Sequence, residues 1–289
     1  MKYHIQVFIS VLLFAMSFVW SKQALEYLSP ISLITFRLIV AGIVLVLFAK
    51  AMGKLQRLKA KDWMIFTLVA LLEPVAYFLF ENIGLSMVSP TLACLIIGLI
   101  PVLSPFAAHF INKEKISKWS YIGLFVSFSG VLLFSFSGGV ESFEGRMEGI
   151  LLLFGAVLTA VLYNIMIQRL TRRFNSMTII GYINLLSLIF LVPLLFVVCG
   201  EELASLSFSW GWFYPVVALG VLCSSVAYSL NANGLRVLGV VRTTIYINLM
   251  PGITAIASYF LMGEELSFIE IAGIIISIAG LFISNRRSS

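Results

Sequence analysis

Long apolar segments alternate with short polar clusters along the whole chain. Each apolar segment runs for about 20 residues, the length with which an α-helix crosses the hydrocarbon core of a bilayer. The clusters between them hold most of the charged and turn-forming residues. Cutting the chain at these clusters predicts ten spanning helices, at residues 4–25, 30–52, 62–85, 88–111, 117–137, 147–170, 176–199, 210–233, 239–262 and 266–285. The pattern therefore predicts an all-α integral membrane protein.

The composition supports this interpretation and narrows the partners. Of the 289 residues, 61% are hydrophobic and 11% charged, with a mean hydropathy of +1.06, whereas soluble domains are about half apolar and about a quarter charged. The net charge of +6 does not indicate a nucleic-acid partner, because that requires a basic face on a soluble module. We therefore expect the chain to lie in a lipid bilayer and to bind no nucleic acid. The composition does not indicate an oligomeric state.

Basic residues predict the orientation in the membrane. With the N-terminus inside, fifteen Lys and Arg residues fall in cytoplasmic segments, and only Lys22 and Arg146 fall in external ones. Because Lys and Arg near span ends favour the cytoplasmic side, both termini are predicted to be cytoplasmic.

The chain contains an internal repeat. Shifting the sequence by 150 residues aligns Gly84–Phe134 with Gly234–Ser284 without a gap, and twelve of 51 positions agree. The matches include Pro101 with Pro251 and Glu114 with Glu264. We therefore predict two homologous five-helix domains, residues 1–137 and 147–285. Five is an odd number, so the second repeat enters the membrane inverted, an arrangement found in many secondary transporters with a substrate site between the halves.

Several stretches complete this picture: AMSFVWSKQAL ends the first span, SPISLITFRLIVAG opens the second with Arg37, and NIGLSMVSPTLACLIIGLIPVLSPF pairs with NANGLRVLGVVRTTIYINLMPGITAI. The segments EKISKWSYIGLFVSFSGVLL and EELSFIEIAGIIISIAGLFI end the two halves. In these features the sequence resembles the drug/metabolite transporter superfamily, in particular the ten-span EamA type. The resemblance implies a transporter of the bacterial cytoplasmic (inner) membrane that exports amino acids or related metabolites. Where the family usually has a Trp-Gly pair in the first span, this chain has Phe14 and Ala15, so no role of that tryptophan is transferred.

Two glutamates interrupt the third span. Glu73 lies near its middle and Glu81 near its outer end, with Tyr77 between them at helical spacing on one stripe. A charged side chain at the bilayer centre costs roughly 3 kcal/mol on insertion scales, so this stripe is expected to face a cavity between the repeats. Pro74 lacks an N–H and leaves the carbonyl of Ala70 without its helical partner, which predicts a kink beside Glu73.

Two roles remain open for Glu73. As a functional group it couples protons to transport or binds a substrate amine, since burial disfavours a charged carboxyl and an opening cavity restores it. As a structural group it pairs with Arg37. The same choice applies to Glu81, for which a structural role as a gate or a partner of Arg37 is favoured.

Other polar residues within spans are candidates for the substrate path. They are Tyr163 and Asn164 in the sixth span, Ser224, Tyr228 and Asn231 in the eighth, and Tyr246 and Asn248 in the ninth. Interhelical hydrogen bonding is the competing role for each of them. Tyr246 and Asn248 point to different sides, so we expect one of them to line the cavity. Trp20 is either an interface anchor or a substrate-stacking residue.

Prolines and small residues suggest how the helices move and pack. Pro101 and Pro251 at matching positions, and Pro74, are predicted hinges. Gly123, Ser127 and Gly130 match Gly273, Ser277 and Gly280, which predicts two small-residue faces suited to close helix packing.

The remaining chemistry favours transport over catalysis. Three cysteines lie far apart, only two histidines are present, and there is no nucleotide-binding loop, so we expect no metal, no cofactor and no enzyme activity. The sequence predicts a gradient-driven secondary transporter of a small organic molecule. The favoured function is export of amino acids or related metabolites, and proton coupling is a further hypothesis. The alternative is an importer or exchanger of sugars, nucleotides or drugs; a membrane enzyme is a remote one.

Overall fold

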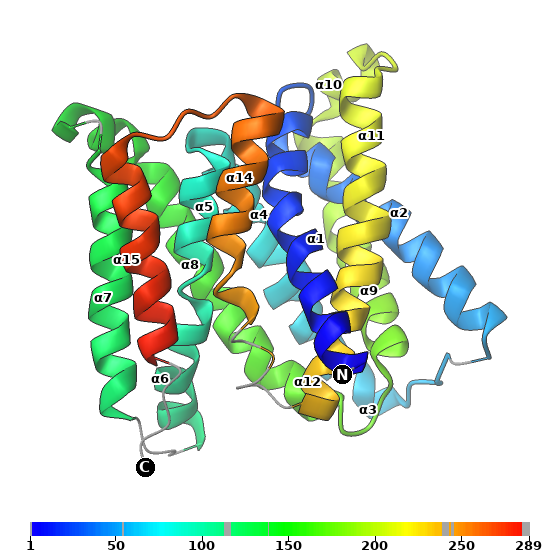
Figure 1. The fold of residues 1–289 in the computed structure, drawn as a ribbon. Coiled ribbons are helices and arrows are strands. Elements are labelled where there is room, and N and C mark those ends of the chain that lie inside the picture. Colours follow the sequence, from blue (N-terminus) through cyan, green and yellow to red (C-terminus); the bar gives the residue numbers. More distant parts are fainter. Residues whose placement is uncertain are drawn as a thin grey trace.

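The computed structural model describes residues 2–53, 55–112, 117–137, 139–238, 243 and 246–284, and these form a helical bundle (Figure 1). The first half contains α1 (Lys2–Ala24), α2 (Pro30–Ala51), α3 (Ala60–Ala70), η1 (Leu71–Ala76), α4 (Tyr77–Met87), α5 (Pro90–Ile97), α6 (Ile100–Asn112) and α7 (Lys118–Ser135). The second contains α8 (Gly139–Leu170), α9 (Ser176–Val198), the short α10 (Gly200–Ser205), α11 (Trp210–Ala218), η2 (Leu219–Ala227), α12 (Tyr228–Leu238), α14 (Met250–Met262) and α15 (Phe268–Ser284). Every predicted span holds a helix.

Length and composition fit a membrane-spanning bundle. Among the described residues, seven helical stretches are long and apolar enough to cross a bilayer, and residues 90–104, 250–262 and 268–284 form shorter apolar helices. In Figure 1, α1 begins and α15 ends at the same, lower end of the bundle. The prediction of an all-helical chain with helices suited to a membrane is thus confirmed.

Helix starts follow local sequence rules. Ser29 and Ser89 each accept a hydrogen bond from a backbone N–H three residues later, and each is followed by a proline in the first turn. A serine cap satisfies one of the free N–H groups of the first turn, and proline needs no partner there. The Ser-Pro pairs therefore fix where α2 and α5 begin.

The fourth and ninth spans are interrupted next to the matched prolines. α5 ends at Ile97 and α6 begins at Ile100, so Pro101 is the second residue of the new helix. Pro251 is likewise the second residue of α14. The backbone breaks at these points, as proline favours; their use as hinges stays a prediction.

The predicted small-residue faces pack directly against each other where α7 and α15 lie side by side (Figure 1). A Cβ atom added to Gly130 would lie 2.4 Å from the Ser277 nitrogen, and one added to Gly280 would lie 2.3 Å from the Ser127 nitrogen. The Ser127 hydroxyl donates to the Ser277 carbonyl at 3.1 Å. Only side chains this small let the two backbones approach, so the packing prediction is confirmed.

The third span breaks where the sequence predicts. Residues 71–76 form a π-helical segment, and Glu73 within it has an extended backbone (φ −151°, ψ 121°). Pro74 provides no N–H for the Ala70 carbonyl, and the Ser187 hydroxyl of α9 lies 3.5 Å from that oxygen. The same hydroxyl donates to the Ile183 carbonyl at 2.7 Å, so the Ala70 oxygen receives only a weak contact from the neighbouring helix.

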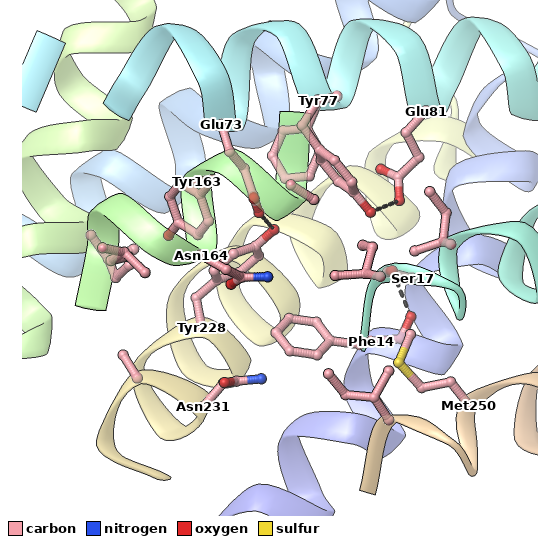
Figure 2. Close-up of a pocket in the computed structure, with 18 of the residues that line it drawn as sticks. Phe14, Ser17, Glu73, Tyr77, Glu81, Tyr163, Asn164, Tyr228, Asn231 and Met250 are labelled. Atoms are coloured by element: carbon pink, nitrogen blue, oxygen red, sulfur yellow. Dashed lines mark hydrogen bonds between the residues drawn. The ribbon is translucent and has the colours of Figure 1, made fainter. Parts of the chain in front are cut away.

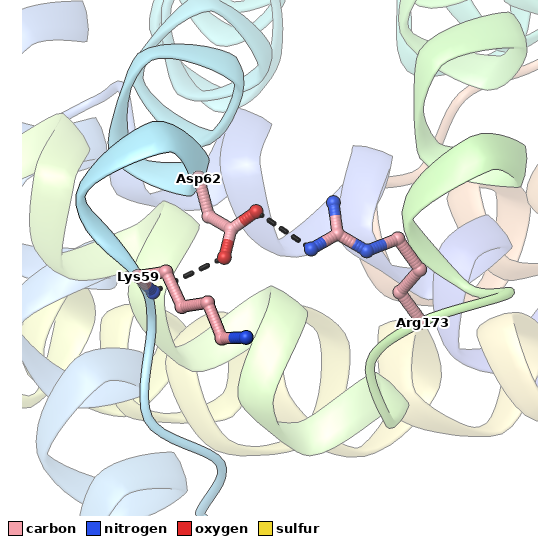
Figure 3. Close-up of polar contacts among 3 residues, drawn as sticks. All are labelled: Lys59, Asp62 and Arg173. Atoms are coloured by element: carbon pink, nitrogen blue, oxygen red, sulfur yellow. Dashed lines mark hydrogen bonds and ion pairs between the residues drawn. The ribbon is translucent and has the colours of Figure 1, made fainter.

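An ion pair connects the halves at the end that we predict to be cytoplasmic (Figure 3). Arg173 Nη2 lies 2.8 Å from Asp62 Oδ1, and the Lys59 backbone N–H donates to Asp62 Oδ2 at 3.1 Å. Asp62 is buried while Arg173 is half exposed. The contact joins the start of α3 to the turn after α8.

Candidate functional site

A cavity of about 790 Å³, including its opening, lies between helices of both halves (Figure 2). Its polar wall consists of Ser17, Arg37, Glu73, Tyr77, Glu81, Tyr163, Asn164, Tyr228 and Asn231. Its apolar wall includes Phe14, Phe18, Phe78, Ile97, Ile100, Ile167, Ile180, Ile247 and Met250. An apolar pocket with a few convergent polar groups is the usual form of a small-molecule site.

Glu73 reaches the cavity from the break in the third span. Glu73 is 6% exposed, and Tyr228 from the second half donates a hydrogen bond to its Oε1 (Figure 2). Within the described part of the chain, that tyrosine is the only hydrogen-bond partner of the carboxyl group. A buried carboxylate with one neutral partner is costly to keep charged, so Glu73 is suited to exchange a proton or to meet a cation.

Glu81 lies one helical turn above Tyr77 on α4, and the Tyr77 hydroxyl donates to Glu81 Oε1 at 2.8 Å. Both side chains are buried. Although the extended backbone at Glu73 interrupts the helix, all three residues of the predicted stripe line the cavity. The structure therefore brings two carboxyl groups into one site.

Arg37 lies in the wall but pairs with neither glutamate. Its Nε donates to the Ser224 hydroxyl at 2.6 Å, and its guanidinium stands 4.1 Å from the centre of the Phe78 ring. Among the described residues, the salt bridge within 4.0 Å is the one between Asp62 and Arg173. The hypothesis of an ion pair with Glu73 or Glu81 is corrected: the serine and the aromatic face take the place of the carboxylate, consistent with cation–π attraction.

Access to the cavity is uneven along its length. Asn164, in the last third of α8, and Asn231, in the first turn of α12, are partly exposed, whereas Tyr77 and Glu81 are buried. Tyr163 is also buried and lies beside Glu73 in Figure 2. Since α8 and α12 finish at the predicted cytoplasmic end, the cavity opens toward that side.

Three predicted residues lie outside the cavity wall. Trp20 packs in a separate cluster, edge-on to Tyr214 at 6.5 Å between ring centres. His4 Nδ1 lies 2.9 Å from the Tyr246 hydroxyl. Asn248 is fully buried at the turn before α14. Neither Tyr246 nor Asn248 lines the cavity, contrary to the expectation that one would; their neighbours Ile247 and Met250 do.

Sequence reasoning missed the contribution of α1. Phe14 and Ser17 line the cavity, and the Phe14 ring meets the Tyr228 ring edge-on at 5.0 Å. The available signal was positional: Phe14 stands where the resembled family usually has the tryptophan of its Trp-Gly pair. Over the ranges that the structure describes, no group of three or more His, Cys, Asp or Glu side chains is arranged to hold a metal ion.

Comparison with known proteins identifies the family. The chain matches the EamA-like transporter family over residues 1–136 and 147–286. An uncharacterized transporter of Archaeoglobus fulgidus is 25% identical over 288 residues, which cover 99% of this chain and 98% of the relative. A probable terminal-alkyne amino-acid exporter of Streptantibioticus cattleyicolor is 25% identical over 281 residues, covering 97% and 92%. The uncharacterized inner membrane transporter YhbE of Escherichia coli is 28% identical over 179 residues, covering 60% and 56%.

A solved crystal structure shares the fold. It superposes with a TM-score of 0.70 over 98% of both chains at 18% identity. With the family match extending over both halves, the helical bundle and its cavity are those of a transporter rather than an enzyme. The chain is a multi-pass membrane protein and a secondary transporter that belongs to the EamA-like transporter family.

Proposed function

We propose that the protein exports an amino acid or a related small metabolite by alternating access, and that Glu73 couples this movement to protons. The observation that carries the proposal is the buried Glu73 carboxyl, placed at a helix break in the wall of a cavity between the halves. A carboxyl in this setting is stable without charge when the cavity is closed and ionises when water enters. Broken helices are where secondary transporters commonly bind ions and substrates.

The cavity suits a cargo with an amine and an apolar body. Two glutamates provide acceptors for an ammonium group, and Asn164 and Asn231 add neutral polar contacts. Phe14 and Met250 offer an apolar surface on the opposite wall. A relative whose name is probable terminal-alkyne amino-acid exporter supports this cargo class.

In the proposed cycle, the described conformation faces inward. Its outer end is tied shut by Lys22, whose Nζ donates to the carbonyls of Leu85, Ser86 and Val88 at 2.8, 3.1 and 2.8 Å. A second tie joins the halves, since the Thr91 hydroxyl donates to Glu264 Oε2 at 2.9 Å. Opening toward the outside by rocking of the halves requires the Thr91–Glu264 contact to break, whereas the Lys22 contacts lie within the first half.

The topology forms part of the same proposal. Residues 1–137 and 147–285 act as two inverted units that rock against each other, with Pro74, Pro101 and Pro251 at their breaks. Both termini lie in the cytoplasm and the bilayer is the cell (inner) membrane. The excess of basic residues in the predicted inner segments supports the orientation, and the printed name of YhbE supports the membrane.

A flux screen in reconstituted vesicles tests the proposal. Vesicles that contain the purified protein are loaded in turn with amino acids, amines, sugars and nucleotides. The efflux of each compound is measured at two pH values. We expect pH-dependent efflux of amino acids or related amines, lost in Glu73→Gln and kept in the matched control Glu265→Gln, whose side chain is exposed. Normal turnover, pH response and affinity in Glu73→Gln would overturn it.

A further inference from the structure

Behind Glu73 lies a second, much smaller cavity. Glu73 and Tyr228 belong to the walls of both cavities, so the hydrogen bond between them stands at the boundary. The rear wall is completed by Asn184 of α9 and Ser224 of η2. Here we call this space the rear cavity.

Asn184 has an unused hydrogen-bond donor in this space. The residue is 4% exposed, and its Nδ2 has no hydrogen-bond partner. Leaving a buried amide N–H unpaired is unfavourable, and native proteins seldom do so without a reason. A donor needs an acceptor, and the Glu73 carboxyl group, which accepts from Tyr228, lines the same cavity.

Among the described groups around Glu73, Asn184 Nδ2 is a buried donor without a hydrogen-bond partner. Tyr228 already donates to Glu73 from the front, and Arg37 is engaged by Ser224 and the Phe78 ring. The other titratable neighbours are Tyr163 of α8 and the Tyr77–Glu81 pair of α4.

The local backbone permits the carboxyl group to move. Glu73 lies in the π-helical η1, and Tyr228 directly follows the π-helical η2. Such bulges have looser hydrogen bonding than α-helices and often lie at functional sites. A side chain on an extended residue within η1 can turn without distorting a regular helix.

We propose that Asn184 is a positioning residue that holds the ionised Glu73 carboxylate in the rear cavity, directly or through one water. Glu73 then alternates between Tyr228 in front and Asn184 behind. In the rear position the carboxylate gains an amide donor, while the Tyr228 hydroxyl is released. This inference rests on the proposed function, because it assigns a second hydrogen-bonding position to the Glu73 carboxyl group that is proposed to couple protons to transport.

Infrared difference spectroscopy of the purified protein in lipid nanodiscs tests the inference without any cargo. A pH change from about 5 to about 9 brackets the range in which a buried carboxyl group titrates, and the Glu73 bands are those missing in Glu73→Gln. We expect Asn184→Leu to move the Glu73 carboxylate band to higher wavenumber, because the carboxylate loses a donor. Asn184→Gln keeps an amide and should retain most of the wild-type position.

Asn82→Leu is the matched control, since Asn82 is a buried asparagine that lines neither cavity. If Asn184→Leu does not fold, Asn184→Val serves with the same expectation. Unchanged Glu73 bands in the apolar variants, an equal shift in Asn82→Leu, or no Glu73 band in this pH range would each overturn the inference. A failure of the proposed function would be seen separately. In that case Glu73→Gln would show normal flux, while Asn184→Leu would still shift the Glu73 band.

Discussion

The two π-helical segments η1 and η2 occupy matching places in the two halves but carry different chemistry. At the 150-residue offset of the repeat, Glu73 aligns with Cys223 and Glu81 aligns with Asn231. Both segments depart from α-helical hydrogen bonding, although only η1 contains a proline. The bulge therefore belongs to the shared architecture, while the acidic groups belong to one half.

This difference makes the site depend on contacts between the halves. The acid of η1 is met by Tyr228, which follows η2, and Arg37 of α2 is met by Ser224 of η2. One half supplies the charges and the other supplies neutral partners. Glu73 and Arg37 are thus each held by a residue that moves relative to them if the halves rock, which couples protonation of Glu73 to conformation. Glu81 is held within its own half by Tyr77.

The largest effect is expected from removing the acid of η1. Glu73→Gln keeps the shape but cannot release a proton, and a hydrogen bond to a charged group contributes about 1.5–3 kcal/mol. At the upper value transport falls roughly a hundredfold, and its pH dependence becomes flat. Efflux from proteoliposomes at several pH values measures both. A variant with near-normal rate and a wild-type pH profile would show that the acid is only structural.

A smaller loss is expected from removing the partner that follows η2. Tyr228→Phe deletes the hydroxyl that donates to Glu73 while keeping the ring contact with Phe14. The loss of about 1.5 kcal/mol corresponds to roughly tenfold slower transport. Combining it with Glu73→Gln in a double-mutant cycle checks the pairing: the two effects should not add. Full additivity would separate the two residues.

Removing the proline of η1 should lower transport. Pro74→Ala supplies an N–H that the Ala70 carbonyl can accept only if the segment straightens, because the backbone of Glu73 between them is extended. Transport should fall by no more than about fivefold, equivalent to about 1 kcal/mol. Vesicle efflux measures the rate, and dye-based melting checks that the variant is folded. A faster variant would contradict the role of the break.

The smallest effect is expected at the position in η2 that matches Glu73. The Cys223 thiol donates to the Leu13 carbonyl at 3.2 Å, and Cys223→Ser preserves a donor of similar size. Its effect on transport should stay within about twofold, as for substitutions of about 0.5 kcal/mol or less. A loss comparable to that in Glu73→Gln would mean that the halves contribute equally.

Features with a local sequence signature could be predicted. The ten spans follow from apolar length, and the break beside Glu73 follows from Pro74. The contact of α7 with α15 follows from matched small residues. In each case the cause acts within one helix or repeats in register, so no knowledge of neighbouring helices is needed.

Features that depend on how a helix is rotated could not be predicted. Phe14 and Trp20 are six residues apart on α1, so they differ by about 240° around the axis, and only Phe14 faces the cavity. An apolar face toward lipid looks the same in sequence as one toward protein. Arg37 was hard to place for a related reason: its partners Ser224 and Phe78 are neutral and carry no charge pattern.

The most direct test of the central claim is proton movement driven by cargo. Vesicles containing a pH-sensitive dye and the purified protein receive a gradient of the amino acid identified by the flux screen, at equal external and internal pH. We predict that wild type moves protons in proportion to cargo, whereas Glu73→Gln moves none above protein-free vesicles. Cargo-driven proton movement in Glu73→Gln equal to that of wild type would contradict the assignment of Glu73 as the coupling group.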